Sequence, residues 1–249
     1  MPDDSLLEDD RSTHHARDSR GQLPEPGAVR TLSELARELR AEPDMDALLR
    51  HIVEATVAEI DAADHGGITL VDKNRVRAVA ATSPVVNGLD ERQNDIGEGP
   101  CLSSLREQIT VRSDDLAAEP RWPKFTAAAV DEGVHSMLSV QLFVEEENLG
   151  ALNLYSNSPD AFSAADEYAA MAMAAHAAVA MKGKQLESNL RTALGSRDII
   201  GQAKGILMER YKIDADEAFR LLVMASQRTH HKLREIADEL TATGELRTD

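Results

Sequence analysis

After Ser163 almost forty residues run without a proline, and their apolar side chains recur at helical spacing. Ser163 and Asp166 match a capping box, in which the serine and the acidic residue three positions later bond to each other's backbone N–H. This segment therefore predicts one long helix. Its apolar positions include Met171, Ala174, Ala178, Met181, Leu186, Leu190, Ala193 and Leu194.

Part of this predicted helix has the spacing of a coiled coil. Leu186, Leu190, Ala193, Arg197 and Ile200 are separated alternately by four and three residues, which approximates a heptad seam that Arg197 interrupts. We therefore expect the helix from about residue 163 to 191 to hold a homodimer.

The continuity of the helix is a separate question. Gly195 relieves the constraint on the backbone, and Ser196 is able to cap a new helix. The sequence therefore predicts a kink or break at this pair, at the end of a helical connector over residues 183–196.

Charge is distributed unevenly along the chain. Residues 1–189 hold 34 acidic and 17 basic residues, whereas residues 190–249 hold 10 of each. The overall net charge of −17 excludes a uniformly basic body that binds nucleic acid. Any nucleic-acid site must be local, and the charge-balanced end of the chain leaves Lys and Arg free to cluster on one face.

Composition also restricts the compartment and the cofactors. The single cysteine cannot form an internal disulfide and is too few for a structural zinc site. We expect no metal and no cofactor. The sequence has no run of 18 apolar residues, and its acidic start lacks the basic-then-apolar order of a secretory signal. We therefore expect a cytoplasmic protein that does not enter a membrane.

The first part of the chain changes character near residue 28. Residues 1–28 are polar and lack apolar periodicity, so we expect a disordered tail. Apolar positions then follow helical spacing from Val29 to Leu39 and from Leu48 to Ile60. These two segments predict amphipathic helices.

Strand-like runs separated by turn-forming residues come next. Residues 68–71 and 76–80 predict a hairpin, because Asp72, Lys73 and Asn74 favour a turn. Further strands are expected at 109–111, 136–143 and 150–155, with a helix over 124–133. The sequence therefore predicts an α+β unit in which helices flank a central antiparallel sheet.

The chain ends in residues that predict a small all-α bundle. Asp214 and Glu217 are spaced as a second capping box, ahead of a helix that carries Phe219 and Leu222. A third helix carries Leu233, Ile236, Ala237 and Leu240 and stops before Gly244. With the end of the long helix, these make three helices.

This C-terminal stretch resembles the ANTAR domain, a three-helix RNA-binding module of bacterial transcription antiterminators. Two blocks occur in the family's order and separation, Ala-Lys-Gly-Ile-Leu-Met at 203–208 and Glu-Ala-Phe at 217–219. Three departures are visible: Val223 and Met224 stand where relatives often carry basic residues, and His230 stands where an Asn commonly precedes the last helix. The matching residues also include Arg197, Ile200, Gln202, Asp216, Leu222, Ser226 and Lys232-Leu233-Arg234-Glu235-Ile236-Ala237.

The middle of the chain resembles a GAF domain of the kind often fused to ANTAR. The resemblance rests on Gly97-Glu98-Gly99-Pro100-Cys101, Asp114-Asp115-Leu116, Arg121-Trp122-Pro123, Gly133-Val134 with Ser136, and the segment 149–155. GAF domains are small-molecule or signal sensors built on an antiparallel sheet, and the fold alone does not name the ligand. The two resemblances divide the chain into a GAF sensor domain at 29–182, the connector, and an ANTAR domain at 197–245.

Together the resemblances imply a regulator that binds structured leader RNA, carrying tandem stem-loops, and promotes antitermination in response to a small-molecule or protein signal at the GAF domain. Two alternatives stay open. In one, the protein is an interaction adaptor whose helical tail serves dimerisation alone; in the other, the terminal helices bind duplex DNA. An enzyme is not expected, because the sequence lacks the common phosphate-loop, dinucleotide, hydrolase and zinc-protease motifs.

The predicted RNA face combines cations for phosphates with side chains able to hydrogen-bond or stack on unpaired bases. The acidic residues near 214–217 need not face RNA, because they favour a helix start. We interpret Ala203, Leu207, Ala218, Phe219 and Leu222 as core and Gly205 as a helix-packing site. The predicted face comprises Arg197, Lys204, Arg210, Gln227, Thr229, His230, Lys232 and Arg234.

For four other residues we prefer a structural role to a functional one. Cys101 follows a Gly-Pro turn, but a lone cysteine is more often a small buried side chain than a redox or attachment site. His176 has no partner at metal-ligand spacing. Trp122 and Phe125 are expected to anchor helices on the sheet rather than to line a ligand pocket.

Overall fold

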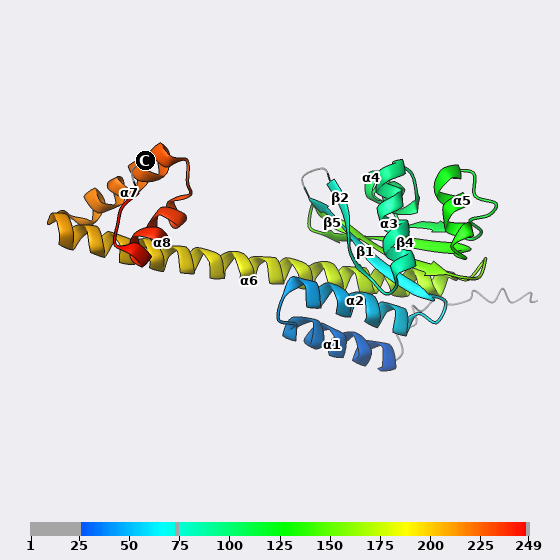
Figure 1. Ribbon diagram of the computed structural model, residues 1–249. Coiled ribbons are helices and arrows are strands. Elements are labelled where there is room, and N and C mark those ends of the chain that lie inside the picture. The colour runs from blue at the N-terminus through cyan, green and yellow to red at the C-terminus, as the bar shows by residue number, and fades with distance from the viewer. Residues whose placement is uncertain (1–25, 73–74, 248–249) are drawn as a thin grey trace, which may run out of the picture.

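A computed structural model of the protein describes residues 26–72 and 75–247 (Figure 1). The predicted disordered tail lies outside the described residues as far as residue 25. Its last three residues are a correction, because helix α1 (Pro26–Ala41) begins at Pro26. A proline suits the first helical position, where the backbone N–H that it lacks would have no partner inside the helix.

The predicted antiparallel sheet is confirmed and has five strands in the order β2-β1-β5-β4-β3. The hairpin of β1 (His65–Asp72) and β2 (Arg75–Ala81) pairs through β1 with β5 (Glu147–Ser156). The long hairpin of β4 (Ser136–Val144) and β5 forms the middle, and the short β3 (Val111–Ser113) closes the edge against β4. The sequence placed this edge strand at 109–111, two residues too early.

Helices cover both faces of the sheet (Figure 1). On one face, α2 (Met45–Glu59) and the first part of α6 (Ala164–Tyr211) pack on the strands, with α1 outside them. On the other face lie α3 (Pro84–Ile96), α4 (Pro100–Glu107) and α5 (Pro123–Asp131). The sequence analysis predicted only α5 on this face. Helices α3 and α4 were missed because polar residues, Asp90 and Gln93 in α3 and Ser104 in α4, occupy part of their buried faces and interrupt the apolar periodicity.

Helix α6 begins as predicted, with both hydrogen bonds of the Ser163–Asp166 capping box present. The predicted break at Gly195 and Ser196 is wrong, because α6 is α-helical without interruption through both residues. Ser196 does not cap a new helix; its hydroxyl donates to the carbonyl oxygen of Thr192 at 2.7 Å. A single glycine costs a helix about 1 kcal/mol, which the packing of α6 at both of its ends offsets.

The end of α6 forms the third helix of a small bundle with α7 (Ala215–Thr229) and α8 (Leu233–Thr243), far along α6 from the sheet (Figure 1). Asp214 caps α7 by accepting from the N–H groups of Asp216 and Glu217, although Glu217 does not complete the predicted reciprocal box. The buried residues of this bundle are Ala203, Leu207, Ala218, Leu222, Ala225, Ile236, Ala237 and Leu240.

Asp90 of α3 lies at the centre of a buried polar network against the sheet. The Tyr155 hydroxyl donates to Asp90 Oδ1 at 2.5 Å, and Asn153 Nδ2 donates to the same oxygen at 2.9 Å. Oδ2 has no partner among the described residues, and it lies 2.5 Å from where a Cβ at Gly67 would stand. Gly67 therefore lets α3 approach β1. Burial raises the pKa of Asp90 from 3.8 to about 7, against the lowering effect of the two hydrogen bonds.

This pKa predicts how stability changes with pH. Because the folded domain holds the Asp90 proton more tightly than the unfolded chain, the stabilisation is complete below about pH 4 and is lost as pH rises to about 7. The slope is about 1 kcal/mol per pH unit. Asp90→Asn cannot ionise, so the free energy of unfolding of this variant, relative to that of the unchanged protein, should increase from pH 5 to pH 7.

Urea unfolding followed by the fluorescence of Trp122 measures this, because that buried side chain is the only tryptophan in the chain. Asp95→Asn, which changes an exposed carboxylate of the same helix, is the control. Parallel pH profiles for Asp90→Asn and the unchanged protein would show that Asp90 is ionised in the folded domain at neutral pH.

Candidate nucleic-acid interface

The end of α6 and the start of α7 place a cation beside an aromatic ring. Lys204 Nζ lies 5.8 Å from the centroid of the Phe219 ring, which is cation–π distance. Arg197, seven residues before Lys204, lies on the same side of α6 by helical periodicity and is exposed. Two predicted RNA-binding cations thus line the α6–α7 side of the bundle.

Phe219 itself is a correction to the sequence analysis. It was interpreted as core, but 40% of it is exposed, whereas its neighbours Ala218 and Leu222 are fully buried. Successive helix residues are about 100° apart, so Phe219 is turned away from the buried line that Ala218 and Leu222 define. The spacing of apolar residues in α7 is compatible with a core position for Phe219. The buried face of α7 is too narrow to include its side chain.

Arg210 lies on a different side of α6. It lines a shallow cavity of about 540 Å³ with Gly205 and Thr241, the latter on α8. Six residues separate Lys204 from Arg210, which turns the two side chains about 120° apart. The prediction that Gly205 is a helix-packing site is also wrong, because a Cβ there would have nothing within 4 Å.

The junction of α7 and α8 holds most of the remaining predicted residues. His230 ends α7 in the left-handed region with φ 56°, a conformation that Asn adopts more easily than most residues. An Asn would therefore suit this position as well. Thr229 is half-buried, and its hydroxyl donates a hydrogen bond to the Ala225 carbonyl oxygen at 2.8 Å. Lys232 N–H donates to Glu235 at the start of α8.

The charged members of the predicted face are available to a ligand. Among the described residues, no carboxylate forms an ion pair with Arg197, Lys204, Arg210, Lys232 or Arg234, whereas Lys212 and Arg220 are paired with Glu209 and Glu217. Gln227, His230, Lys232 and Arg234 are exposed. The structure thus divides the predicted set among the α6–α7 side, the α6–α8 side and the α7–α8 junction.

The sheet domain holds the residues for which the sequence favoured a structural role. Cys101 is buried, and burial followed by the nearby Asp90 carboxylate raises the pKa of its thiol to about 12, which suppresses the reactive thiolate. Trp122 and Phe125 are buried against the sheet as expected. His176 Nδ1 lies 2.8 Å from the Ala172 carbonyl oxygen. Within the described ranges no group of His, Cys, Asp and Glu is arranged to hold a metal ion.

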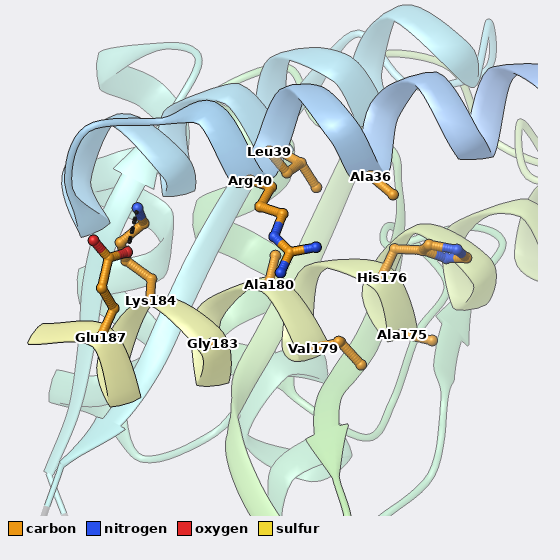
Figure 2. Close-up of a pocket in the computed structure, with 10 residues that line it drawn as sticks. All are labelled: Ala36, Leu39, Arg40, Ala175, His176, Val179, Ala180, Gly183, Lys184 and Glu187. Carbon is orange, nitrogen blue, oxygen red and sulfur yellow. Dashed lines mark hydrogen bonds and ion pairs between the residues drawn. The ribbon is translucent and has the colours of Figure 1, made fainter. Parts of the chain in front are cut away.

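Exposed apolar side chains, those of Leu186, Leu190 and Leu194, form a strip along α6 between the two units. Every residue from 185 to 194 is exposed, and Leu186 and Leu190 are exposed by 59% and 56%. Toward the sheet the strip continues through Val179 into a groove of about 770 Å³ between α1 and α6 (Figure 2). Figure 2 shows Arg40 reaching from α1 toward α6 across this groove, near Ala180.

Comparison with family models accounts for both units. Residues 42–182, which include the sheet, match the model of the GAF domain. Residues 188–240, which include the terminal bundle, match the model of the ANTAR domain. The chain belongs to the GAF-ANTAR family. It therefore joins a sensor domain to an RNA-binding antitermination domain, and it is a regulator of that general kind.

Solved structures share the fold of the GAF unit. The GAF domain of Acinetobacter phosphoenolpyruvate-protein phosphotransferase is 18% identical, with a TM-score of 0.52 over 65% of this chain and 96% of that one. Free methionine-R-sulfoxide reductase from Neisseria meningitidis, in complex with its substrate, is 18% identical, with a TM-score of 0.52 over 63% and 89%. A bacteriophytochrome from R. palustris is 11% identical, with a TM-score of 0.57 over 83% and 48%.

At these identities the likeness concerns the fold alone. None of the curated proteins matches the GAF-ANTAR chain in sequence. In the part of the chain that the structure describes, no helix combines the length and the apolar character needed to cross a bilayer.

Proposed function

We propose that this protein is a cytoplasmic, non-enzymatic regulator whose ANTAR domain binds leader RNA with tandem stem-loops and thereby promotes transcription antitermination. The observation that carries the proposal is local: the ANTAR domain presents five cations that no described carboxylate pairs with, within a chain whose net charge is −17. An acidic body repels RNA in general, so binding must be concentrated where these cations lie. The eight predicted residues remain the proposed contact set.

Their roles differ with their chemistry and place. Arg197, Lys204, Arg210, Lys232 and Arg234 are cations suited to phosphates. Gln227 and His230 are exposed and able to hydrogen-bond to the edges of unpaired bases. Thr229 is the least available member, because its hydroxyl already donates within α7. Since Arg210 faces away from Lys204, the RNA would have to follow the bundle around α6 to reach both.

We further propose a homodimer held along α6. Leu186 and Leu190 expose more than half of their surface in the single chain. With Ala193 they keep the spacing of a heptad seam. A second copy of the same helix is the occupant that this self-complementary spacing fits. Parallel copies would hold two ANTAR domains side by side, one for each stem-loop, and so raise the affinity by effective concentration.

Helix α6 gives the signal a physical route. Ala170, Ala174 and Ala177 are buried in the core of the sheet domain, and Ala203 and Leu207 are buried in the ANTAR core. Because one uninterrupted helix connects the two cores, a shift or rotation imposed at the sheet reaches the ANTAR domain without a hinge. We propose that a signal at the GAF domain acts by moving α6.

The RNA contacts are tested with an RNA pool that carries two hairpins with randomised loops, from which bound sequences are selected. Lys204→Ala should lower affinity for every selected RNA and reduce the slope of log K against log salt by about one unit. His230→Ala should instead change the preference among loops. Arg191→Ala, which removes an α6 cation that is paired with Glu187 outside the ANTAR core, is the control and should change neither.

Two results would contradict this assignment. If no RNA is selected while the dimer forms normally, the adaptor function takes its place, and a preference for duplex DNA over looped RNA would favour the DNA alternative. If RNA binds but Lys204→Ala leaves both affinity and salt slope unchanged, the contact face is placed wrongly.

The dimer is tested with Leu186→Glu combined with Leu190→Glu. Like charges in the seam should shift sedimentation from dimer to monomer, and affinity for two-hairpin RNA should fall toward that for one hairpin. Glu substitutions at Ser188 and Asn189, which are exposed between the two leucines, are the matched control. A chain that sediments as a monomer before any change would refute the dimer.

The rigid connection is tested at Gly195 with two substitutions of opposite effect. Gly195→Pro should break α6 at a cost of about 3 kcal/mol, whereas Gly195→Ala should stabilise the helix by about 1 kcal/mol. With the dimer intact, the proline variant should lose the preference for two hairpins over one, because its ANTAR domains are no longer held at a fixed spacing. The alanine variant should keep it. Equal preference in both variants would exclude a role for α6 rigidity.

A further inference from the structure

Four of the six aromatic side chains in the GAF unit are buried, whereas neither of the two in the ANTAR domain is. The chain has eight: Trp122, Phe125, Tyr155 and Phe162 of the GAF unit are buried, whereas Phe143 and Tyr168 of that unit are exposed by 44% and 73%. The ANTAR domain has two, Tyr211 and Phe219, and both are exposed, by 53% and 40%. Its core is filled by aliphatic and alanine side chains instead. Both aromatic rings of the ANTAR domain therefore lie on its surface, where their burial against a ligand would be favourable.

The surroundings of Phe219 identify the kind of ligand. Lys204 Nζ lies 5.8 Å from the ring centroid, and no described carboxylate is in an ion pair with it. Along the same side of α7, at helical spacing, follow Val223 and Ser226, both half-buried. This combination of an exposed ring and an ammonium group that no described carboxylate pairs with differs from an apolar protein-docking patch, in which charged residues are depleted.

An unpaired nucleotide offers complementary chemistry. Every base has an apolar face that stacks on an aromatic ring, and each nucleotide carries a phosphate that a nearby lysine neutralises. Because stacking does not read base edges, such a platform tolerates sequence and leaves discrimination to hydrogen-bonding groups elsewhere.

We propose that Phe219 is a stacking platform for one unpaired base of the bound RNA, with Lys204 holding a phosphate next to that base. The assignment rests on the proposed RNA-binding function and adds to it a contact that is not ionic. Phe219 is outside the predicted contact set because its sequence position suggested core. Its ring gains contact area from the base at little entropic cost, since two torsions are already limited by α7.

The two residues should therefore fail in different ways. Loss of the ring should lower RNA affinity by roughly 5- to 150-fold, the range found for removal of one stacked base contact, with no change in the salt slope. Loss of the ammonium should change the salt slope. Phe219→Leu removes the aromatic face but keeps an apolar side chain, and Phe219→Trp keeps the aromatic face.

The experiment uses the full chain and a selected two-hairpin RNA in which single loop adenines are replaced, one at a time, by fluorescent 2-aminopurine. Stacking on Phe219 should quench one position in the unchanged protein and in Phe219→Trp, and that quenching should be lost in Phe219→Leu. Met224→Leu, at another exposed apolar residue of α7, is the matched control and should keep both affinity and quenching. Thermal unfolding of each variant establishes that the ANTAR domain is folded.

The outcomes separate the two proposals. If the unchanged protein selects no RNA, the proposed function fails and Phe219 has no base to stack on. If RNA binds with an ordinary salt slope but Phe219→Leu retains full affinity and quenching, the stacking platform is refuted while the function stands. Loss of quenching in Tyr211→Leu but not in Phe219→Leu would refute it too, because the base would then stack on the other exposed ring.

Discussion

The structure depends on the burial of one helix at both of its ends. Ala170, Ala174 and Ala177 let α6 lie close on the sheet, and Ala203 and Leu207 fill the ANTAR core. Neither core is complete without α6, since each unit would otherwise expose the apolar surface that α6 covers. Between the cores the described residues leave α6 uncovered, because every residue from 185 to 194 is exposed, so its continuity rests on helix propensity and on packing at the two ends.

This arrangement gives the exposed middle of α6 its significance. Among the described residues the neighbours of α6 all lie toward its ends, and none of them covers Leu186 or Leu190. Their heptad spacing is the observation on which the proposed homodimer rests. The same geometry makes rotation or translation of α6 the one mechanical link between sheet and ANTAR bundle that the described residues provide.

The charge pattern complements the mechanical one. The acidic excess lies in residues 1–189, and the ANTAR domain is balanced, so its cations act against a background that disfavours RNA elsewhere. In the GAF domain the unusual titratable groups are internal: Asp90 is buried beside Tyr155, and the pKa of each group is raised, mainly by burial. A buried acid of this kind contributes to stability only while protonated, which links the packing of α3 on the sheet to pH near neutrality.

The sequence by itself determined the strands of the hairpins, the long helix, the two terminal helices and the family, because alternation, capping residues and motif order are local properties. Only the tertiary structure decided whether α6 is broken at Gly195, since end packing outweighs the local preference of one glycine. It also decided that Phe219 is on the surface, that Gly205 is open and that Arg210 faces away from Lys204. Helical spacing gives the angle between two side chains on a helix. Which side of the helix is buried depends on where α7 and α8 pack, and that is set by contacts between residues far apart in the chain.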